Sequence, residues 1–300
     1  MQGLLLINKP KGITSFSAVS RVKRAASEKR VGHTGTLDPM ATGVLPVFLG
    51  RATSLCSLVL AADKKYIAEI KLGTTTDTCD ITGEVLEERI VDVTQSDIEN
   101  ILGKFKGKVS QIPPMYSALK RDGVRLYDLS RQGKTVEIEP REIEVFDLSV
   151  TKPLNSENCF SVFCHVSKGT YIRSLARDIG EALGCGATLT ALQRVETAGF
   201  DISQCVDLES LNEDSISEYL LNEEIAVKHL RALSVTKNQA TRFCNGGQLA
   251  FERLNLENFQ DNELFRIKYK NQFLGIGVAD CEKQQVAIKC IINYPEVSQL

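Results

Sequence analysis

Residues 66–73, with the sequence YIAEIKLG, restrict the possible folds of this chain more than any other segment. Apolar side chains occupy every second position from Tyr66 to Leu72, and the charged residues Glu69 and Lys71 stand between them. Because successive side chains of an extended chain point to opposite faces, this period of two predicts a strand with one buried face. The fold must therefore contain a sheet that is covered on at least one side.

A helix is predicted close to the N-terminus. The segment INKPKGITS predicts a short buried strand, a turn, and then a helix that begins near Thr14 or Ser15. Phe16, Val19 and Val22 would form the apolar stripe of this helix. Its basic residues would then point elsewhere.

Further elements follow in an irregular order. Amphipathic helices are predicted for residues 94–106 and 168–184, and the segment FSVFCHVS predicts another strand. Strands separated by helices without a regular strand–helix–strand rhythm favour the α+β class. We therefore expect a mixed, largely antiparallel central sheet with surrounding helices.

The length of the chain indicates more than one domain. Because 300 residues exceed the usual size of a single core, a large domain and a smaller one are expected. We place the large domain at residues 1–232 and a small β-rich domain at residues 233–300, where short apolar runs are broken by turn residues. Residues 108–140 combine adjacent prolines, turn glycines and many cations, which predicts an exposed insertion.

Charge is distributed unevenly along the chain. The net charge is only −2, but residues 1–60 carry eight basic residues against two acidic ones, and residues 104–141 carry nine against four. Residues 201–224 carry eight acidic residues and no basic one. A basic face balanced by an acidic segment favours binding to a polyanion through phosphate neutralisation. The alternative is that these charges are merely solvated and bind nothing.

The cysteines and the N-terminus indicate the cytoplasm. The nine cysteines form no CxxC pair, their number is odd, and most have apolar neighbours, so we expect reduced structural thiols. With only three histidines, a dedicated metal site is poorly supported. No apolar stretch is long enough to span a membrane, and the N-terminus lacks the basic region of a signal peptide.

The first candidate functional residue is Asp38, in the segment GHTGTLDPMATG. An aspartate followed by a proline is an ordinary helix start, with the carboxylate as N-cap and Pro39 at the first helical position. Against this, the glycines of the segment allow close approach of the main chain, and His33 and three threonines surround the carboxylate with polar groups. Both interpretations stay open, and a carboxylate fixed at a helix start would satisfy both.

Two familiar kinds of site are excluded for this segment. No GK[ST] follows it, so it is not a phosphate-binding P-loop. It has no serine elbow and His33 has no evident third partner, so it is not a hydrolase triad. One carboxylate without a metal leaves covalent or base chemistry.

Arg173 is the second candidate. It lies in the first turn of a predicted helix, where the helix dipole disfavours a cation. Its neighbours Ile172 and Leu175 face the core, so the guanidinium must lie near the buried boundary. A pair with Asp38 would explain this placement, and a surface arginine that tolerates a small penalty is the alternative. Tyr66 is explained equally well by core packing, if its hydroxyl finds a partner.

Several segments, taken together, resemble the bacterial tRNA pseudouridine synthase B family. They are LLLINKPKGITS, VGHTGTLDPMATGVLPVFLGRAT, KKYIAEIKLGTTTDTCDITGE, PPMYSALKRDGVRLYDLSRQG, KGTYIRSLARDIGEALG and LTALQRVETAGF, in the order of the family and over roughly residues 1–200. FCNGGQLA and FLGIGVAD resemble the family's small C-terminal RNA-binding module of the PUA type. The resemblance implies the pseudouridine synthase fold and isomerisation of the T-loop uridine at tRNA position 55, with base flipping and with no cofactor or metal.

The resemblance also implies roles for individual residues. Asp38 would attack the base, attack the sugar C1′ or remove a proton at C2′, so that the glycosidic bond breaks and uracil reattaches through C5. Arg173 would hold Asp38 ionised, because an adjacent cation lowers the pKa of a carboxyl group. Tyr66 would stack on the flipped uracil and is a candidate for helping to remove the C5 proton. The implied substrate-binding residues are His33, which helps extract the base, and Asp80, Tyr171 and Leu192, which line the uracil pocket.

The predicted insertion would grip the T-arm of tRNA by its shape and phosphates, with Lys120, Arg121 and Arg125 as contacts.

Two other functions compete with the enzyme. One is a non-catalytic tRNA-binding or folding helper of the same fold, against which the intact Asp38 and Arg173 argue. The other is a metal-dependent hydrolase, which lacks ligands. We expect a cytoplasmic monomer that acts on tRNA without a membrane or an obligatory protein partner.

Overall fold

The computed structural model describes residues 1–117, 120–121, 124–125, 136–254 and 258–294, and of residues 120, 121, 124 and 125 it describes the main chain only. A ten-stranded sheet forms the larger part of the molecule, with the order β14-β1-β3-β12-β4-β11-β10-β7, and with β13 paired to β12 and β2 to β3. Its strands are β1 (Gly3–Lys9), β2 (Val31–His33), β3 (Thr42–Leu49), β4 (Lys64–Leu72), β7 (Gly107–Gln111), β10 (Arg141–Lys152), β11 (Cys159–Val166), β12 (Ala187–Thr197), β13 (Phe200–Asp201) and β14 (Val206–Asp207).

Most neighbours in this sheet run antiparallel. The junctions of β3 with β12 and of β1 with β14 are parallel, and all the other pairs are antiparallel. The predicted α+β fold with a mixed, largely antiparallel sheet is therefore confirmed. The predicted strand at residues 66–73 is β4, in which buried residues alternate with partly exposed ones.

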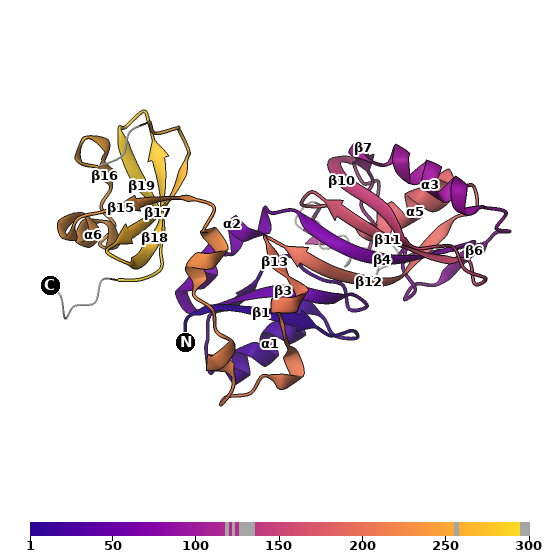
Figure 1. The fold of residues 1–300 in the computed structure, drawn as a ribbon, viewed down its shortest axis with the longest axis horizontal. Coiled ribbons are helices and arrows are strands. Elements are labelled where there is room, and N and C mark those ends of the chain that lie inside the picture. The colour runs from indigo at the N-terminus through magenta and orange to yellow at the C-terminus, as the bar shows by residue number, and fades with distance from the viewer. Residues whose placement is uncertain (118–119, 122–123, 126–135, 255–257, 295–300) are drawn as a thin grey trace.

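Helices cover the two halves of the sheet separately (Figure 1). Helix α1 (Ser15–Ala25) packs on β1 and β3, and helices α3 (Gln95–Lys104) and α5 (Ile172–Ala182) pack on the half formed by β4, β10, β11 and β12. The helices predicted from the sequence are thus present. Smaller elements are α2 (Cys56–Leu60), the hairpin β5 (Thr74–Thr76) and β6 (Val85–Glu88), the hairpin β8 (Lys120–Arg121) and β9 (Val124–Arg125), and the 3-10 helices η1 (Gly50–Leu55), η2 (Ile202–Gln204), η3 (Leu208–Ser210), η4 (Ile216–Tyr219) and η5 (Glu223–Val227).

Helix α1 begins where the sequence predicted, but its buried face differs by one position. Thr14 is the N-cap, and its side chain accepts a hydrogen bond from the Ser17 amide. Phe16 was expected in the apolar stripe and is instead 78% exposed. Its place on the core side is taken by Ser15, which is buried because it bonds the loop beside it rather than packing apolar surface.

No helix follows Asp38. Residues 38–41 form a turn, in which the Ala41 amide donates to the Asp38 carbonyl, and β3 begins at Thr42. The helix-cap interpretation of Asp38 and Pro39 was therefore wrong. Pairing with β1 and β12 holds the following residues extended, and this tertiary constraint overrides the local signal for a helix.

A separate five-stranded sheet, with the order β15-β17-β18-β19-β16, forms the C-terminal part. Its elements are β15 (Arg231–Ser234), α6 (Lys237–Cys244), β16 (Leu249–Ala250), η6 (Phe251–Arg253), β17 (Leu264–Tyr269), β18 (Gln272–Asp280) and β19 (Gln285–Ile291). This part lies beside α2, at the end of the molecule away from α3 and β7 (Figure 1). Phe273 and Ile276 share a core with Leu55 and Val59 of the large part, so the small β-rich unit is docked and not tethered loosely.

Two further properties concern the chain as a whole. All nine cysteines are free, and Cys164 and Cys185 are among those fully enclosed by apolar residues, as expected for structural thiols. No helix in the described ranges is both long enough and apolar enough to cross a membrane.

Gly43 makes the parallel contact between β3 and β12 possible. Its φ is +104°, and a Cβ atom there would lie 2.1 Å from the carbonyl oxygen of Arg194 on β12. That atom belongs to the main chain of a central strand, so it cannot move aside cheaply. The glycine is therefore a requirement of the sheet itself.

We expect Gly43→Ala to lower the free energy of unfolding by about 3 kcal/mol, from left-handed strain together with overpacking. Gly184→Ala is the matched control, since Gly184 has a φ of +81° but nothing within 4 Å of its Cβ position. The control should lose only about 1–2 kcal/mol, from strain alone. Denaturant unfolding of both variants measures the difference, and equal losses would contradict the close approach as its cause.

Candidate active site

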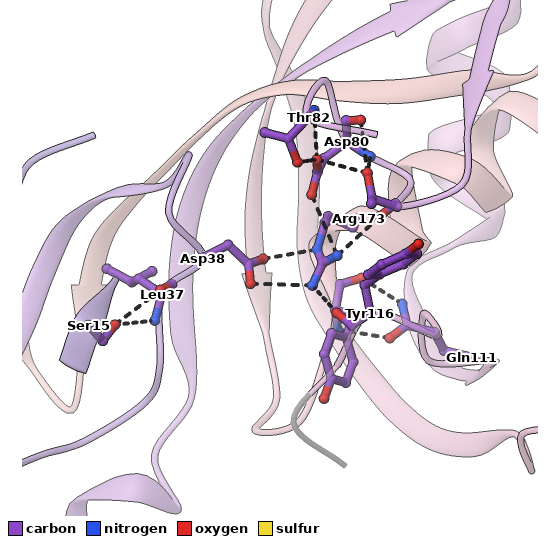
Figure 2. A network of polar contacts seen from close by, with 10 residues as sticks. Ser15, Leu37, Asp38, Asp80, Thr82, Gln111, Tyr116 and Arg173 are labelled. Carbon is purple, nitrogen blue, oxygen red and sulfur yellow. Dashed lines mark hydrogen bonds and ion pairs between the residues drawn. The ribbon is translucent and has the colours of Figure 1, made fainter. Parts of the chain in front are cut away.

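Asp38 and Arg173 form an ion pair, as the sequence predicted. Oδ2 of Asp38 lies 2.9 Å from Nε of Arg173, and Oδ1 accepts a hydrogen bond of 3.3 Å from Nη2. Figure 2 shows the two side chains pointing toward one another from opposite sides of the site. The guanidinium side chain is only 6% exposed whereas the carboxylate is 36% exposed. The carboxylate can thus meet a ligand while the arginine stays behind it.

The guanidinium of Arg173 is held by more than Asp38. Nη1 donates to the carbonyl of Thr78 at 3.1 Å, and Nη2 donates to the carbonyl of Tyr116 at 2.9 Å. Oδ2 of Asp80 lies 3.5 Å from Nη1 (Figure 2). With its donors engaged on several sides, Arg173 is fixed in place, so the orientation of the Asp38 carboxylate is fixed as well.

Asp80 is a buried carboxylate inside a tight turn. Its Oδ1 accepts hydrogen bonds from the Thr82 amide at 2.9 Å, from the Thr82 hydroxyl at 2.5 Å and from the Thr78 hydroxyl at 3.0 Å. The sequence predicted Asp80 only as a residue of a pocket wall. The structure adds that its second oxygen faces Arg173, a link that residues 93 positions apart in the chain gave no local signal for.

The loop that carries Asp38 is tied to the N-terminal helix. The hydroxyl of Ser15 accepts from the Leu37 amide at 2.8 Å and donates to the Leu37 carbonyl at 3.1 Å. The Gly12 amide donates to the carbonyl of Pro39 at 2.8 Å. These bonds fix the main chain on both sides of Asp38, so the catalytic candidate sits on a loop with little freedom.

A strap formed by residues 111–117 crosses the N-terminus of α5. The Gln111 side chain accepts from the Tyr171 amide at 2.9 Å and donates to the Tyr171 carbonyl at 3.1 Å. The Ser174 hydroxyl donates to the Ile112 carbonyl at 2.9 Å. Because the strap continues to the Tyr116 carbonyl, it fixes the helix that carries Arg173 and also accepts a bond from Arg173 itself. The sequence predicted Tyr171 in the site and missed Gln111.

Tyr66 and Leu192 lie on adjacent strands and are 6% and 8% exposed. The register pairs Leu192 with Ala68 and Arg194 with Tyr66, so the four side chains share one face of β4 and β12. Burial raises the pKa of Tyr66 above its ordinary value, although the neighbouring Arg194 opposes the shift. The phenol is therefore neutral at physiological pH.

Arg194 was not predicted, and a signal for it exists in the sequence. It stands two positions after Leu192, so a period of two places it on the same buried face of the strand. A charged residue on a buried face is an anomaly of the kind that marks functional sites.

His33 ends β2 beside the loop and is partly buried. Burial lowers the pKa of its imidazole, and the charge of Arg194 lowers it further, so the ring is neutral at physiological pH. In the described part of the chain, His33 Nδ1 and the buried Thr34 hydroxyl have no hydrogen-bond partner. Unsatisfied buried polar atoms cost stability, so these two atoms are available for contacts with a ligand or water.

The predicted contacts of the insertion cannot be placed side by side with this site. Lys120, Arg121 and Arg125 lie on β8 and β9, and their side chains, like all of residues 126–135, fall outside the described residues.

Burial decides the titration of Asp38. It raises the pKa of the carboxyl group; Arg173 and Lys9 lower it, Asp80 raises it, and the net direction is upward. The sequence suggested a lowered pKa from Arg173 alone and left burial out. Arg173 therefore offsets part of the effect of burial on the pKa of Asp38 and favours the ionised form of the carboxyl group.

The described residues include no group of three or more His, Cys, Asp or Glu side chains that could hold a metal ion. What the geometry offers is one carboxylate, oriented by an arginine, near the aromatic ring of Tyr66. This arrangement suits nucleophilic attack or proton abstraction on a planar ligand.

Comparison with known proteins identifies two matching family models and relatives that share one name. The model of a family described as TruB family pseudouridylate synthase (N terminal domain) matches residues 23–172, and one described as tRNA pseudouridylate synthase B C-terminal domain matches residues 173–233. A protein named tRNA pseudouridine synthase B from Clostridium perfringens (strain 13 / Type A) is 42% identical over 282 residues, which are 93% of this chain and 96% of that protein. One of the same name from Clostridioides difficile (strain 630) is 38% identical over 299 residues, or 96% of this chain and 98% of the relative.

Solved structures share the fold. A chain of a Cbf5-Nop10-Gar1 complex is 26% identical with a TM-score of 0.73, over 97% of this chain and 84% of that chain. A chain of an H/ACA RNP bound to a substrate RNA containing 2′-deoxyuridine is 24% identical with a TM-score of 0.74, over 98% of this chain and 87% of that chain.

The raised pKa of Asp38 predicts that Asp38→Asn is more stable than the wild type at neutral pH. A carboxyl group whose pKa is higher in the folded state contributes stability at low pH and loses it as the pH rises through the folded-state value. The neutral amide avoids that loss, so its advantage should shrink as the pH falls toward about 4. Thermal unfolding as a function of pH measures this.

Asp97→Asn is the control of opposite sign. Hydrogen bonds from Thr94 lower the pKa of Asp97 in the capping box of α3, so this variant should be less stable at neutral pH. An Asp38→Asn variant that melts below the wild type at neutral pH would contradict the dominance of burial.

Proposed function

This chain belongs to the TruB family of pseudouridylate synthases, and we propose that it converts the T-loop uridine at tRNA position 55 to pseudouridine through Asp38. It is a tRNA pseudouridine synthase, an isomerase. The observation that supports the mechanistic proposal is the pair of Asp38 and Arg173, in which a partly exposed carboxylate is oriented by a buried guanidinium that also bonds two main-chain carbonyls.

The reaction rearranges bonds within one nucleoside. The bond from N1 to C1′ breaks, a bond from C5 to C1′ forms, C5 loses its proton and N1 gains one. Attack on the base, attack on C1′ and proton removal at C2′ all begin with an ionised carboxylate in a fixed place. Asp38 meets this requirement because Arg173 offsets the cost of its charge and Pro39 and Leu37 are bonded to the N-terminal segment.

We assign Arg173 and Asp80 to the orientation of Asp38. Arg173 presents two nitrogens to one carboxylate, an arrangement that fixes both distance and plane. Asp80 neutralises part of the remaining charge of the guanidinium and is itself locked by the Thr78 and Thr82 hydroxyls. Without Asp80, Arg173 would keep only its carbonyl partners on that side.

Tyr66 offers its ring to the flipped uracil. Its raised pKa makes the hydroxyl a neutral phenol, which is a poor general base, so we assign it stacking and not removal of the C5 proton. Leu192 and Tyr171 would complete the apolar walls of the uracil pocket. Base–aromatic stacking of this kind offsets part of the cost of flipping a base.

We assign His33 to extraction of the base from the T loop. Its neutral ring stands beside the Asp38 loop with Nδ1 free of partners in the described residues, so it can bond or stack in the space that the uridine leaves. Lys120, Arg121 and Arg125 would grip the T-arm through phosphates.

The two proposed domains correspond to the ten-stranded and the five-stranded sheet. We propose that residues 1–232 form the catalytic domain, with the insertion at about 108–140, and that residues 233–300 form an RNA-binding domain of the PUA type. Strand β15 spans the proposed boundary. We also propose a monomer without an obligatory protein partner. Nine free thiols and a tRNA substrate support action in the cytoplasm.

Release of tritium from tRNA labelled at C5 of the T-loop uridine tests the activity and Asp38 together. The wild type should release it, and Asp38→Asn should be slower by at least about 1000-fold, because the group that acts on the nucleoside is gone. Binding of tRNA should stay within about threefold, since one amide replaces one carboxylate.

Asp97→Asn is the matched control, because it makes the same change at an exposed cap of α3 and should keep the wild-type rate. Normal release by Asp38→Asn would contradict the mechanism. Binding without release by the wild type would contradict the activity.

Arg173→Lys should lose rate and keep affinity. An ammonium cannot meet both oxygens of Asp38 and the two carbonyls of Thr78 and Tyr116 at once. We expect the single-turnover rate to fall about 100-fold, the cost of a misplaced catalytic group, and the Kd for tRNA to change little. An unchanged rate would show that the ion pair does not position Asp38.

A further inference from the structure

Arg194 is among the largest completely buried side chains of the protein, with no exposed surface. It forms no ion pair with a carboxylate anywhere in the described ranges. Its donors are used instead on main-chain carbonyls: Nε donates to Val44 at 2.8 Å, and Nη2 donates to Gly35 at 2.8 Å. Arg194 also stands directly opposite Tyr66 on the same buried face of β12 and β4, where its charge interacts with the Tyr66 hydroxyl.

A buried guanidinium of this kind lowers the stability of the folded protein. A charge removed from water without a partner of opposite charge destabilises the folded protein. Its surroundings add further positive charge, because the partly buried Lys64 lies close by, with its pKa lowered to about 8 by burial and then by Arg194. An apolar side chain of similar volume would fill the same space at lower cost, so packing alone gives no account of the residue.

The three partners of Arg194 explain its position. Gly35 belongs to the loop that carries Asp38 three residues later, Val44 belongs to β3 beyond that loop, and Tyr66 belongs to β4. One guanidinium thus contacts the main chain on both sides of Asp38 and also lies beside the ring of Tyr66.

We propose that Arg194 is a positioning residue of the isomerisation: it holds the Gly35 carbonyl and the Tyr66 hydroxyl in one fixed relation, so that the carboxylate of Asp38 and the ring of Tyr66 meet the same uridine. The inference rests on the proposed function of the site. Arg194 has no exposed atom and touches no substrate, so it acts through the loop and the ring. In this proposal, the Arg194 guanidinium is also the polar partner that the buried hydroxyl of Tyr66 requires.

A double-mutant cycle with Tyr66→Phe tests the role of the bridge. Arg194→Met keeps the volume and removes the fork, and Arg194→Lys keeps the charge and can reach only part of the partner set. We expect the single-turnover rate to fall about 100-fold in the methionine variant and less in the lysine variant, with the Kd for tRNA within about threefold. Combined with Tyr66→Phe, the loss should be clearly smaller than the product of the single losses.

A glycine pair tests the same bridge without changing Arg194. A Cβ at Gly35, which has a φ of +72°, would lie 2.9 Å from Nη1 of Arg194. Gly199 has a φ of +76° and nothing within 4 Å of its Cβ position, so Gly199→Ala carries the same backbone strain alone. Gly35→Ala should lose at least about tenfold in rate and Gly199→Ala should keep it. The ammonium group of lysine is smaller than a guanidinium and relieves the crowding. In an Arg194→Lys background, Gly35→Ala should therefore lower the single-turnover rate by a smaller factor.

The outcomes separate this inference from the activity itself. Multiplicative losses in the cycle, or equal rates for Gly35→Ala and Gly199→Ala, would overturn the role of Arg194 while the wild type still turned over. If neither Arg194 variant folds, the glycine pair decides. Failure of the wild type to release tritium would instead overturn the proposed function.

Discussion

The ion pair of Asp38 and Arg173 joins the two halves of the central sheet, each of which has its own helices packed against it. Asp38 comes from the turn between β2 and β3, under α1, and Arg173 comes from α5, which packs on β4 and β12. Burial of the carboxylate works against its ionised form, and the guanidinium offsets that cost. The Asp80 turn, the strap at 111–117 and the Ser15 bonds to Leu37 all support one end of this pair or the other.

Much of this arrangement was accessible from the sequence, because it depends on local patterns. The period of two at residues 66–73 gave β4 and its buried face, and the cap at Thr14 gave the start of α1. The pairing of Asp38 with Arg173 could be inferred because a cation in the first turn of a helix needs a partner. The resemblance to a known family then supplied roles that no pattern contains.

What the sequence missed depends on contacts between distant segments. The turn after Asp38 carries an ordinary helix signal, and only pairing of β3 with two strands overrides it. Phe16 is exposed because Ser15 turns inward to bond Leu37, which hydrophobicity does not anticipate. The links of Asp80 to Arg173 and of Arg194 to Tyr66 each join different elements of the sheet. The wrong or absent predictions concern residues at or next to the candidate site. There the positions that catalysis requires override local sequence preferences.

The most direct test of the account is an experimental structure of the Asp38→Asn variant bound to tRNA. We expect a T-loop uridine turned out of its stack, with its ring on Tyr66 and its C1′ or C6 within about 3.5 Å of the side chain at position 38. Arg173 should keep its contacts to the carbonyls of Thr78 and Tyr116. A uridine that stays stacked in the loop, or one bound with position 38 out of reach, would contradict it.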